Sequence, residues 1–313
     1  MKAKKSMTLG GLHHVTAIAG PPRDNLAFYV GTLGLRLVKK TVNFDDPATY
    51  HLYYGDTEGR PGSILTFFPW TYASQGHTGT GMVAATTFEV PLGSIAEWAD
   101  RLGKAGANVA DRQERFGEEV LPFHDPDGLP LELAATSRAS QQGGNEGIGV
   151  RGFHSVTLDV AELDDTAQLL GDIFAFRVDD ESDGRLRFRT DRSSRADVID
   201  VLKGDGSTSG RPGVGTVHHI AFRVDSEQEQ LEWRDRLDAA GYRVTPVQDR
   251  QYFKSIYFRE PGGILFEIAT DPPGFTLDES LDELGTMLKL PPWLEPRRVQ
   301  IEAYLEHLPT PSR

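Results

Sequence analysis

Short alternations of apolar and polar residues recur four times along the chain, and each one opens a segment of similar design. An alternation with a period of two residues predicts a strand with one buried face. The four predicted strands cover residues 12–19, 82–90, 152–160 and 217–224. Their starts lie about 65 to 70 residues apart, which indicates a fourfold internal repeat.

A helical pattern follows each predicted strand, with apolar residues three and four positions apart. These helices are expected over residues 26–33, 95–105, 163–174 and 229–240. Three of them end at Gly34, Gly106 and Gly241, because glycine readily adopts the positive φ that terminates a helix. The third copy offers Ala175 and Phe176 at that point instead.

Each copy closes with further short strands, and the last strand follows a turn that usually contains Gly or Pro. These last strands are expected over residues 63–68, 129–134, 198–203 and 264–270. The repeat is therefore a βαβββ module, and the chain is predicted to be an α+β protein with open, barrel-like mixed sheets. A helix covers one sheet face of a module, so the other face needs a second sheet and the modules should combine in pairs.

A stretch rich in Ser, Gln, Gly and Asn separates the second and third modules and predicts a linker over residues 137–149. The linker divides the chain into a first domain of residues 1–136 and a second domain of residues 150–271, with two modules each. Residues 272–313 form a C-terminal extension, in which Pro291-Pro292-Trp293 lies between two predicted amphipathic helical stretches. This helical tail is expected to pack across the modules.

Composition narrows the chemistry that the chain can perform. The formal charge of −13 disfavours nucleic acid and anionic membrane as partners, since both bind through their phosphates. The 313 residues include no cysteine, so any metal must be held by nitrogen and oxygen atoms. The basic start of the chain is followed by no apolar segment of a signal peptide, and a cytoplasmic location is expected.

Equivalent positions in the four copies differ in chemically informative ways. Only the first and fourth copies place a histidine, His14 and His219, just before the β-branched residue of the first strand. At the middle of the last strand the copies read Phe67, Glu132, Asp200 and Glu267. A carboxylate such as Glu267, within an apolar strand, is costly to bury unless it is paired or binds a metal.

The pairing of the modules decides whether these residues meet. If neighbouring modules pair, His14 lies in one half and both His219 and Glu267 in the other, so each half lacks a ligand. If the first module pairs with the fourth, the three residues converge, and we expect this pairing. Glu132 would then be a surface or vestigial carboxylate. Two histidines and one carboxylate suit non-haem iron(II), although manganese and zinc accept the same donors.

The whole chain resembles the vicinal oxygen chelate superfamily, which includes glyoxalases, bleomycin resistance proteins and extradiol dioxygenases. More narrowly, it is similar to ring-cleaving dioxygenases that act on hydroquinones. The residues that carry the resemblance are Leu12-His13-His14-Val15-Thr16, residues 34–46, Tyr50-His51-Leu52-Tyr53, residues 260–271 and Leu290-Pro291-Pro292-Trp293-Leu294-Glu295.

The resemblance implies Fe(II), or alternatively Mn(II), bound by His14, His219 and Glu267. It further implies that five residues support the metal ligands or contact the substrate, namely His13, Thr16, His218, Arg250 and Tyr257. The implied activity is that of an extradiol-type dioxygenase, which inserts both atoms of O2 into a hydroquinone or a related dihydroxylated aromatic compound. The even spread of aromatic residues indicates no clear pocket, and most of them are expected in the core; Phe68, Trp70, Phe253 and Tyr257 are candidate walls of a substrate pocket.

Two alternatives remain open at this stage. A glyoxalase-type lyase would use zinc or nickel and usually four protein ligands, and Phe67 stands where a second glutamate is then expected. A binding protein that sequesters a small aromatic compound would need no metal. Association into a homo-oligomer also remains open.

Overall fold

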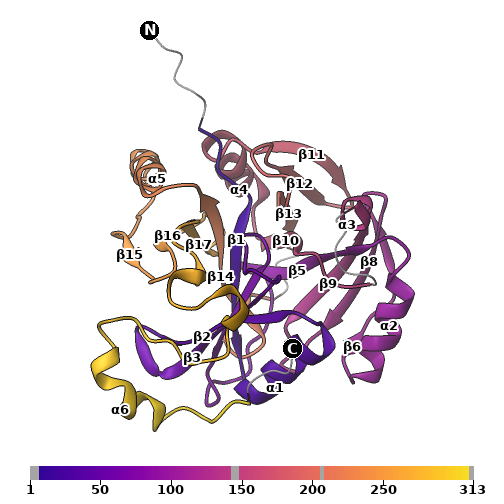
Figure 1. Cartoon of the computed structure of the whole chain (residues 1–313). Coiled ribbons are helices and arrows are strands. Elements are labelled where there is room, and N and C mark those ends of the chain that lie inside the picture. The colour runs from indigo at the N-terminus through magenta and orange to yellow at the C-terminus, as the bar shows by residue number, and fades with distance from the viewer. Residues whose placement is uncertain (1–6, 142–147, 205–207, 310–313) are drawn as a thin grey trace.

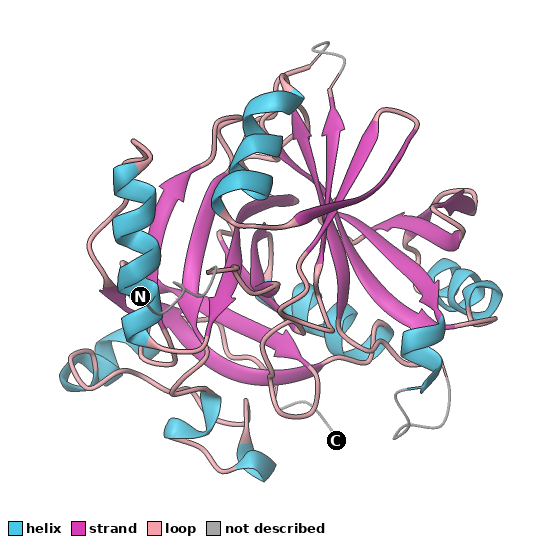
Figure 2. Ribbon diagram, turned by 90° about the horizontal axis from the view of Figure 1, so that it is seen from above, coloured by secondary structure: helices cyan, strands magenta, loops and turns pink. Residues whose placement is uncertain are grey.

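The structure is a computed structural model that describes residues 7–141, 148–204 and 208–309. Two large mixed sheets form its centre, and each curls into an open half-barrel (Figures 1 and 2). The helices pack on the outer faces of the sheets, where they cover one continuous apolar core. The expected α+β fold of βαβββ modules is confirmed.

The first sheet combines the first and fourth modules. Its eight strands are, in spatial order, β15 (Gln248–Asp249), β16 (Lys254–Arg259), β17 (Leu265–Thr270), β14 (Thr216–Val224), β1 (Leu12–Ala19), β4 (Ile64–Pro69), β3 (Asp46–Gly55) and β2 (Arg36–Asn43). Strands β1 and β14 lie side by side and antiparallel at the centre. The expected pairing of the first module with the fourth is therefore observed.

The second sheet combines the second and third modules in the same arrangement. Its strands are β11 (Arg177–Ser182), β12 (Arg185–Arg189), β13 (Val198–Lys203), β10 (Phe153–Val160), β5 (Met82–Pro91), β9 (Pro130–Thr136), β8 (Glu118–His124) and β6 (Asn108–Val109), with β7 (Gln113–Arg115) beside β8. Each sheet thus takes one module from each half of the sequence.

The module helices lie where the periodicity predicted them, except that the first helix begins earlier and the third ends on a residue other than glycine. They are α1 (Pro22–Leu26) continued by the π-helix η1 (Ala27–Thr32), α2 (Ile95–Lys104), α4 (Leu163–Gln168) continued by the π-helix η2 (Leu169–Ile173), and α5 (Glu227–Ala239). The first helix begins earlier than expected because Pro22 occupies its first turn, where proline fits well. In the third module, Ala175 adopts the positive φ of 61° that glycine provides elsewhere.

The predicted linker is partly ordered. Residues Ser137–Gln141 form α3, and Arg138 binds both Glu89 and Asp197, which belong to the second and third modules. Residues 142–147 of the predicted linker lie outside the described residues.

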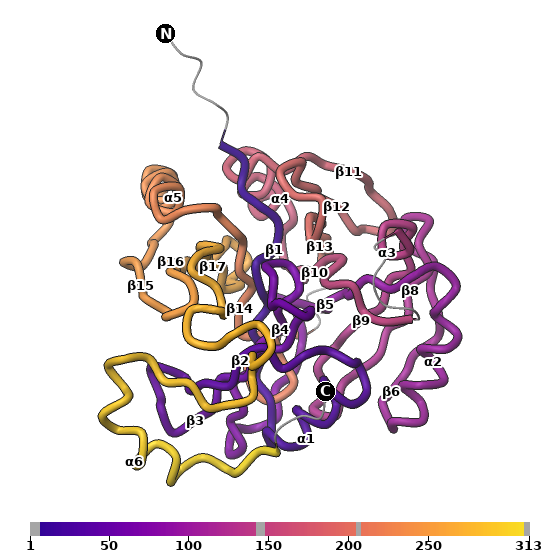
Figure 3. The backbone as a smooth tube through the Cα atoms, viewed as in Figure 1, coloured from indigo at the N-terminus to yellow at the C-terminus, as the bar shows by residue number. Residues whose placement is uncertain are grey.

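The C-terminal tail runs along β2 and β3 and covers that edge of the first sheet (Figure 3). It is less helical than predicted, with only η3 (Phe275–Leu277), η4 (Leu281–Glu283), η5 (Glu295–Arg297) and α6 (Arg298–Glu302). Leu290, Leu294 and Ile301 pack on Val42 of β2. The tail therefore protects an edge strand that would otherwise expose unpaired backbone groups.

Candidate metal centre and cavity

The antiparallel pair β1 and β14 brings two histidines together at the centre of the first sheet. His14 and His219 are both buried, and their Nε2 atoms lie 3.4 Å apart. They are 205 positions apart in the sequence, so only the pairing of the outer modules makes them neighbours.

Glu267 completes the group from β17, which lies beside β14. Its Oε2 atom is 2.9 Å from Nε2 of His219 and 3.3 Å from Nε2 of His14. All ligand atoms of these three residues lie within 4.8 Å of one another, and no other such group occurs among the described residues. Burial raises the pKa of Glu267, but the two histidines outweigh burial and hold that pKa well below its usual range.

The surroundings of Glu267 fit a bound cation. Ser255 donates a hydrogen bond to Oε1, whereas Oε2 makes no satisfactory hydrogen bond with any described residue. A buried carboxylate oxygen without a hydrogen bond is costly, and a metal ion between it and two imidazole nitrogens would remove that cost. The donor set of two nitrogens and one carboxylate suits a divalent transition metal and leaves coordination positions for other ligands.

Two β-bulges place a second histidine beside each of the two potential ligand histidines. Along β1, Leu12 pairs with Phe222 and His14 with Ala221, so His13 is an inserted residue without a partner. Along β14, His218 is skipped in the same way. A bulge re-aims the side chain that it carries, and neighbouring residues need not point to opposite faces of the sheet.

The inserted histidines contact the potential ligands His14 and His219 through their Nδ1 atoms. The Nδ1 atoms of His13 and His14 are 2.9 Å apart, and those of His218 and His219 are 2.7 Å apart. If Nε2 of a ligand histidine faces a metal, its Nδ1 carries the hydrogen and donates it to the inserted histidine. Burial lowers the pKa of His13 and brings the pKa of His218 to about 3, so both rings are neutral and can accept. Such contacts fix the ring orientation of a metal ligand.

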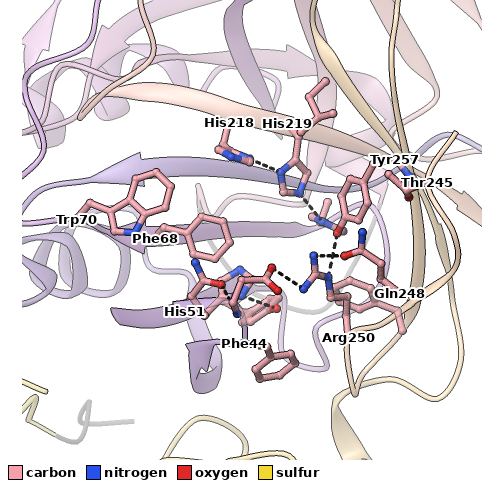
Figure 4. Close-up of a pocket in the computed structure, with 16 residues that line it drawn as sticks. Phe44, His51, Phe68, Trp70, His218, His219, Thr245, Gln248, Arg250 and Tyr257 are labelled. Carbon is pink, nitrogen blue, oxygen red and sulfur yellow. Dashed lines mark hydrogen bonds and ion pairs between the residues drawn. The ribbon is translucent and has the colours of Figure 1, made fainter. Parts of the chain in front are cut away.

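A cavity of about 470 Å³ is lined by His14 and His219 of the three potential ligands, and Figure 4 shows His219 at its wall. Its aromatic walls include the four residues expected from the sequence, Phe68, Trp70, Phe253 and Tyr257. The rings of Phe68 and Trp70 are stacked, with centroids 5.6 Å apart and planes inclined by 16°. A flat apolar molecule fits such a wall.

Arg250 brings a positive charge to the edge of the cavity. Its guanidinium donates to Tyr257 at 3.2 Å, to Asp45 at 3.0 Å and to Gln248 at 2.6 Å, as the dashed lines in Figure 4 indicate. Asp45 follows β2 and Gln248 belongs to β15, so Arg250 bridges the two edges of the curled sheet. Tyr257 is half-buried, and the desolvation of its phenol raises its pKa, which keeps it protonated at neutral pH.

The five residues expected to support the metal or contact the substrate therefore fall into two groups. His218, Arg250 and Tyr257 line the cavity. His13 and Thr16 are buried behind it, His13 against His14 and Thr16 in a 2.9 Å hydrogen bond with Thr66.

The strand register corrects one equivalence drawn from the sequence. Glu267 pairs with Ala221, two residues after His219, and Thr66 pairs with Thr16, two residues after His14. Thr66, and not Phe67, thus occupies the position of Glu267 in the first module. His51 belongs to one of the motifs that carry the family resemblance but was not among the predicted site residues. It lines the cavity, and its Nε2 atom lies 2.8 Å from the Thr66 hydroxyl. The strand register cannot be read from the repeat, because the copies differ in length between their first and last strands.

The second sheet fills the equivalent position with ion pairs. Glu132 is buried and forms hydrogen bonds with Arg115 and Thr87, so the expectation of a surface carboxylate is wrong. Asp200 is held by Arg187 in a paired hydrogen bond of 2.8 and 2.9 Å. Arginine thus satisfies these buried carboxylates where the first sheet offers histidines.

The fold and the possible metal site together point to a known class of proteins. Residues 11–133 and 147–268 match the Glyoxalase/Bleomycin resistance protein/Dioxygenase superfamily. The chain belongs to this superfamily.

Several relatives are similar over nearly their whole length. The chain is 48% identical to the "Putative ring-cleaving dioxygenase MhqO" of Bacillus subtilis (strain 168), over 96% of each chain. It is 34% identical to the "Chlorohydroquinone/hydroquinone 1,2-dioxygenase" of Sphingobium indicum, over 91% of this chain and 92% of the relative.

Solved structures agree with this assignment. The crystal structure of a "putative dioxygenase" from Bacillus subtilis subsp. subtilis str. 168 superposes with a TM-score of 0.92 at 44% identity, covering 98% of this chain and 100% of that one. Glyoxalase I from Zea mays shares the fold with a TM-score of 0.61 at 16% identity, covering 83% and 92%. None of the helices in the described ranges is long and apolar enough to span a membrane.

Proposed function

We propose that the protein is an Fe(II)-dependent dioxygenase that opens the ring of a hydroquinone or a related dihydroxylated aromatic compound. The observation that carries the proposal is a group of two histidines and one glutamate beside a cavity with aromatic walls. The names of the similar proteins support ring cleavage, and one of these names specifies hydroquinone. Mn(II) could occupy the same donors.

His14, His219 and Glu267 would hold the metal. When bound, iron(II) would bring dioxygen and the ionised ring together and pass electrons between them. The ring supplies the electrons, and both oxygen atoms enter the product, so the reaction needs no separate reductant. The ring bond broken would join a hydroxylated carbon to a neighbouring carbon without a hydroxyl, which would make the reaction extradiol-type.

The residues around the cavity would orient the ring and manage its charge. Phe68 and Trp70 offer a flat surface on which an aromatic ring can stack. Arg250 would stabilise negative charge on the ring oxygen, together with the protonated phenol of Tyr257. His218 accepts from His219 through Nδ1, so its Nε2 carries a hydrogen that can be donated to an oxygen in the cavity.

A glyoxalase-type lyase is supported less well, because such a lyase needs a second carboxylate as its fourth metal ligand and Thr66 stands at that position. A binding protein without turnover would not need the three converging ligands. Metal content therefore separates a binding protein from an enzyme, and oxygen uptake separates a dioxygenase from a lyase.

The test is oxygen uptake by protein loaded anaerobically with Fe(II) and then given hydroquinone, methylhydroquinone or chlorohydroquinone. We expect one molecule of O2 to be consumed for each ring opened. The His219→Ala variant should lose both metal and uptake, whereas His154→Ala, at a histidine in the other sheet, should keep both. Stoichiometric metal without uptake across hydroquinones and catechols would refute the proposal and favour the lyase.

A further inference from the structure

The two walls of the first sheet are built to the same plan with different side chains. On one wall Tyr257 pairs with Glu267, and on the other Tyr53 pairs with Thr66, so Tyr53 is the counterpart of Tyr257. Two residues earlier on each strand, Ser255 hydrogen-bonds Glu267 and His51 hydrogen-bonds Thr66. Where the first module lacks the carboxylate, a histidine takes up the space beside the cavity.

His51 links Tyr53 to a buried chain of hydroxyl groups. The Tyr53 hydroxyl lies 2.9 Å from Nδ1 of His51, and Nε2 of His51 lies 2.8 Å from the Thr66 hydroxyl. Thr66 in turn lies 2.9 Å from Thr16. Thr16, Thr66 and Tyr53 are all buried from outside solvent, and of the four residues only His51 and Tyr53 line the cavity. The chain of four groups therefore has one closed end and one end at the cavity.

The closed end sets the direction of the hydrogen bonds. If Thr16 donates to Thr66, Thr66 to His51 and His51 to Tyr53, the hydrogens of Thr16, Thr66 and His51 all have acceptors, and the one hydrogen of the chain without an acceptor is that of the Tyr53 hydroxyl, at the cavity end. In the opposite direction the Thr16 hydroxyl would have no acceptor among the described residues, which costs about 1–3 kcal/mol for a buried group. The first direction leaves the hydrogen of the Tyr53 hydroxyl free to point into the cavity.

The fixed position of Tyr53 makes this hydrogen a specific contact. The Tyr53 ring packs against Phe253 and Phe275, and the ring of His51 lies 4.3 Å from that of Phe68. The pKa of Tyr53 is raised by burial and then by Tyr257, so Tyr53 keeps its hydrogen. A ring oxygen that does not bind the metal can therefore accept a hydrogen bond from a preorganised donor.

We propose that Tyr53, positioned by His51, hydrogen-bonds the ring oxygen that does not bind the metal, and thereby makes the cavity selective for rings with two separated oxygens. The inference rests on the proposed function and names the substrate class more narrowly. A ring with two adjacent hydroxyls can bring both to the metal and needs no such donor. In a 1,4-dihydroxybenzene the second oxygen lies across the ring, where only a side chain of the protein can meet it.

The test compares the binding of hydroquinone and phenol to zinc-loaded protein, which cannot turn the ligand over. Isothermal titration under anaerobic conditions gives the two dissociation constants. In Tyr53→Phe we expect the dissociation constant of hydroquinone to rise about three- to tenfold, the effect of one hydrogen bond, while that of phenol stays constant. His51→Phe should reduce the preference for hydroquinone in the same way. Tyr50→Phe is the matched control, because its hydroxyl lies on the same strand and donates to the Glu306 backbone instead.

Each other result would overturn the inference. If Tyr53→Phe weakened the binding of hydroquinone and phenol equally, Tyr53 would only shape the cavity wall. If neither dissociation constant changed, Tyr53 would not contact the ligand. The inference would also be overturned if the wild-type protein bound hydroquinone no more tightly than phenol. Oxygen uptake by the iron-loaded wild type is a separate measurement, so a failure of the proposed function can be told apart from a failure of this inference.

Discussion

Lys39 of β2 ties the C-terminal tail to the first sheet, and its removal should destabilise the protein strongly. The side chain is fully buried, and its Nζ atom lies 2.5 Å from both Asp278 and Glu279 of the tail. It also lies 4.7 Å from the centre of the Tyr252 ring, whose hydroxyl donates to Asp278. We call Lys39, Asp278 and Glu279 the tail clasp.

The size of the expected loss in the free energy of unfolding depends on how far each of the two carboxylates is exposed. Glu279 is 2% exposed and would keep a buried charge without its cation in Lys39→Met, whereas Asp278 is 23% exposed and can turn towards water. Removing one partner of a buried ion pair costs about 3–5 kcal/mol. The double variant Lys39→Met/Glu279→Gln removes the buried charge as well and should recover most of that loss.

Urea denaturation of the full chain, followed by circular dichroism, measures these free energies of unfolding. Lys203→Met is the control, since Lys203 is 54% exposed and pairs with an exposed Glu162, so a change below about 1 kcal/mol is expected. A loss below about 1 kcal/mol in Lys39→Met, or a double variant as unstable as the single one, would refute the reasoning.

Three further changes test other parts of the structure. His218→Phe should weaken metal binding about 10- to 100-fold, because His219 loses the partner of its Nδ1 atom; competition with a chelator measures the affinity, and an unchanged value contradicts that role. Asp45→Asn should change the free energy of unfolding by less than about 1 kcal/mol, since Asp45 is 75% exposed. Because Arg250 loses its paired carboxylate, 4-nitrophenolate should bind more tightly to the variant. Weaker binding in a spectrophotometric titration would argue against a role of Arg250 in binding the anion. Burial raises the pKa of Asp125 from 3.8 to about 6. The protonated carboxyl therefore contributes stability below about pH 4, and this contribution is lost as the pH rises through 6. The free energy of unfolding then falls by up to about 3 kcal/mol. Between pH 4 and 7 the melting temperature of Asp125→Asn should therefore rise relative to that of the wild type. If the difference between the two melting temperatures stayed constant over this pH range, the raised pKa would be contradicted.

The repeat pattern was sufficient to predict the strands at the centre of both sheets. The alternation at residues 12–19 coincides with β1, because side chains of a strand point alternately to its two faces. Both faces of β1 are buried, although the alternation predicted only one buried face. Comparison of the copies also brought His14, His219 and Glu267 into one group, since equivalent positions in a repeat share a face of the sheet. The structure places these three side chains together.

Features that depend on register could not be read from the sequence. The bulges at His13 and His218 insert one residue into a strand, and nothing in the local sequence marks them as inserted. The position of Thr66 shifts by one residue for a related reason, since the repeat has no fixed length between its first and last strands. The burial of Glu132 depends on Arg115, which lies on the short β7 that no periodicity indicated.

The sharing of each sheet between the two halves of the chain has a consequence for synthesis on the ribosome. When the first half has emerged, β1 and β5 each lack one neighbour, because their partners β14 and β10 have not yet been made. Two long apolar strand edges are then open to another chain. Two nascent first halves could pair through these edges, so rapid completion of the second half protects the protein from joining the wrong partner.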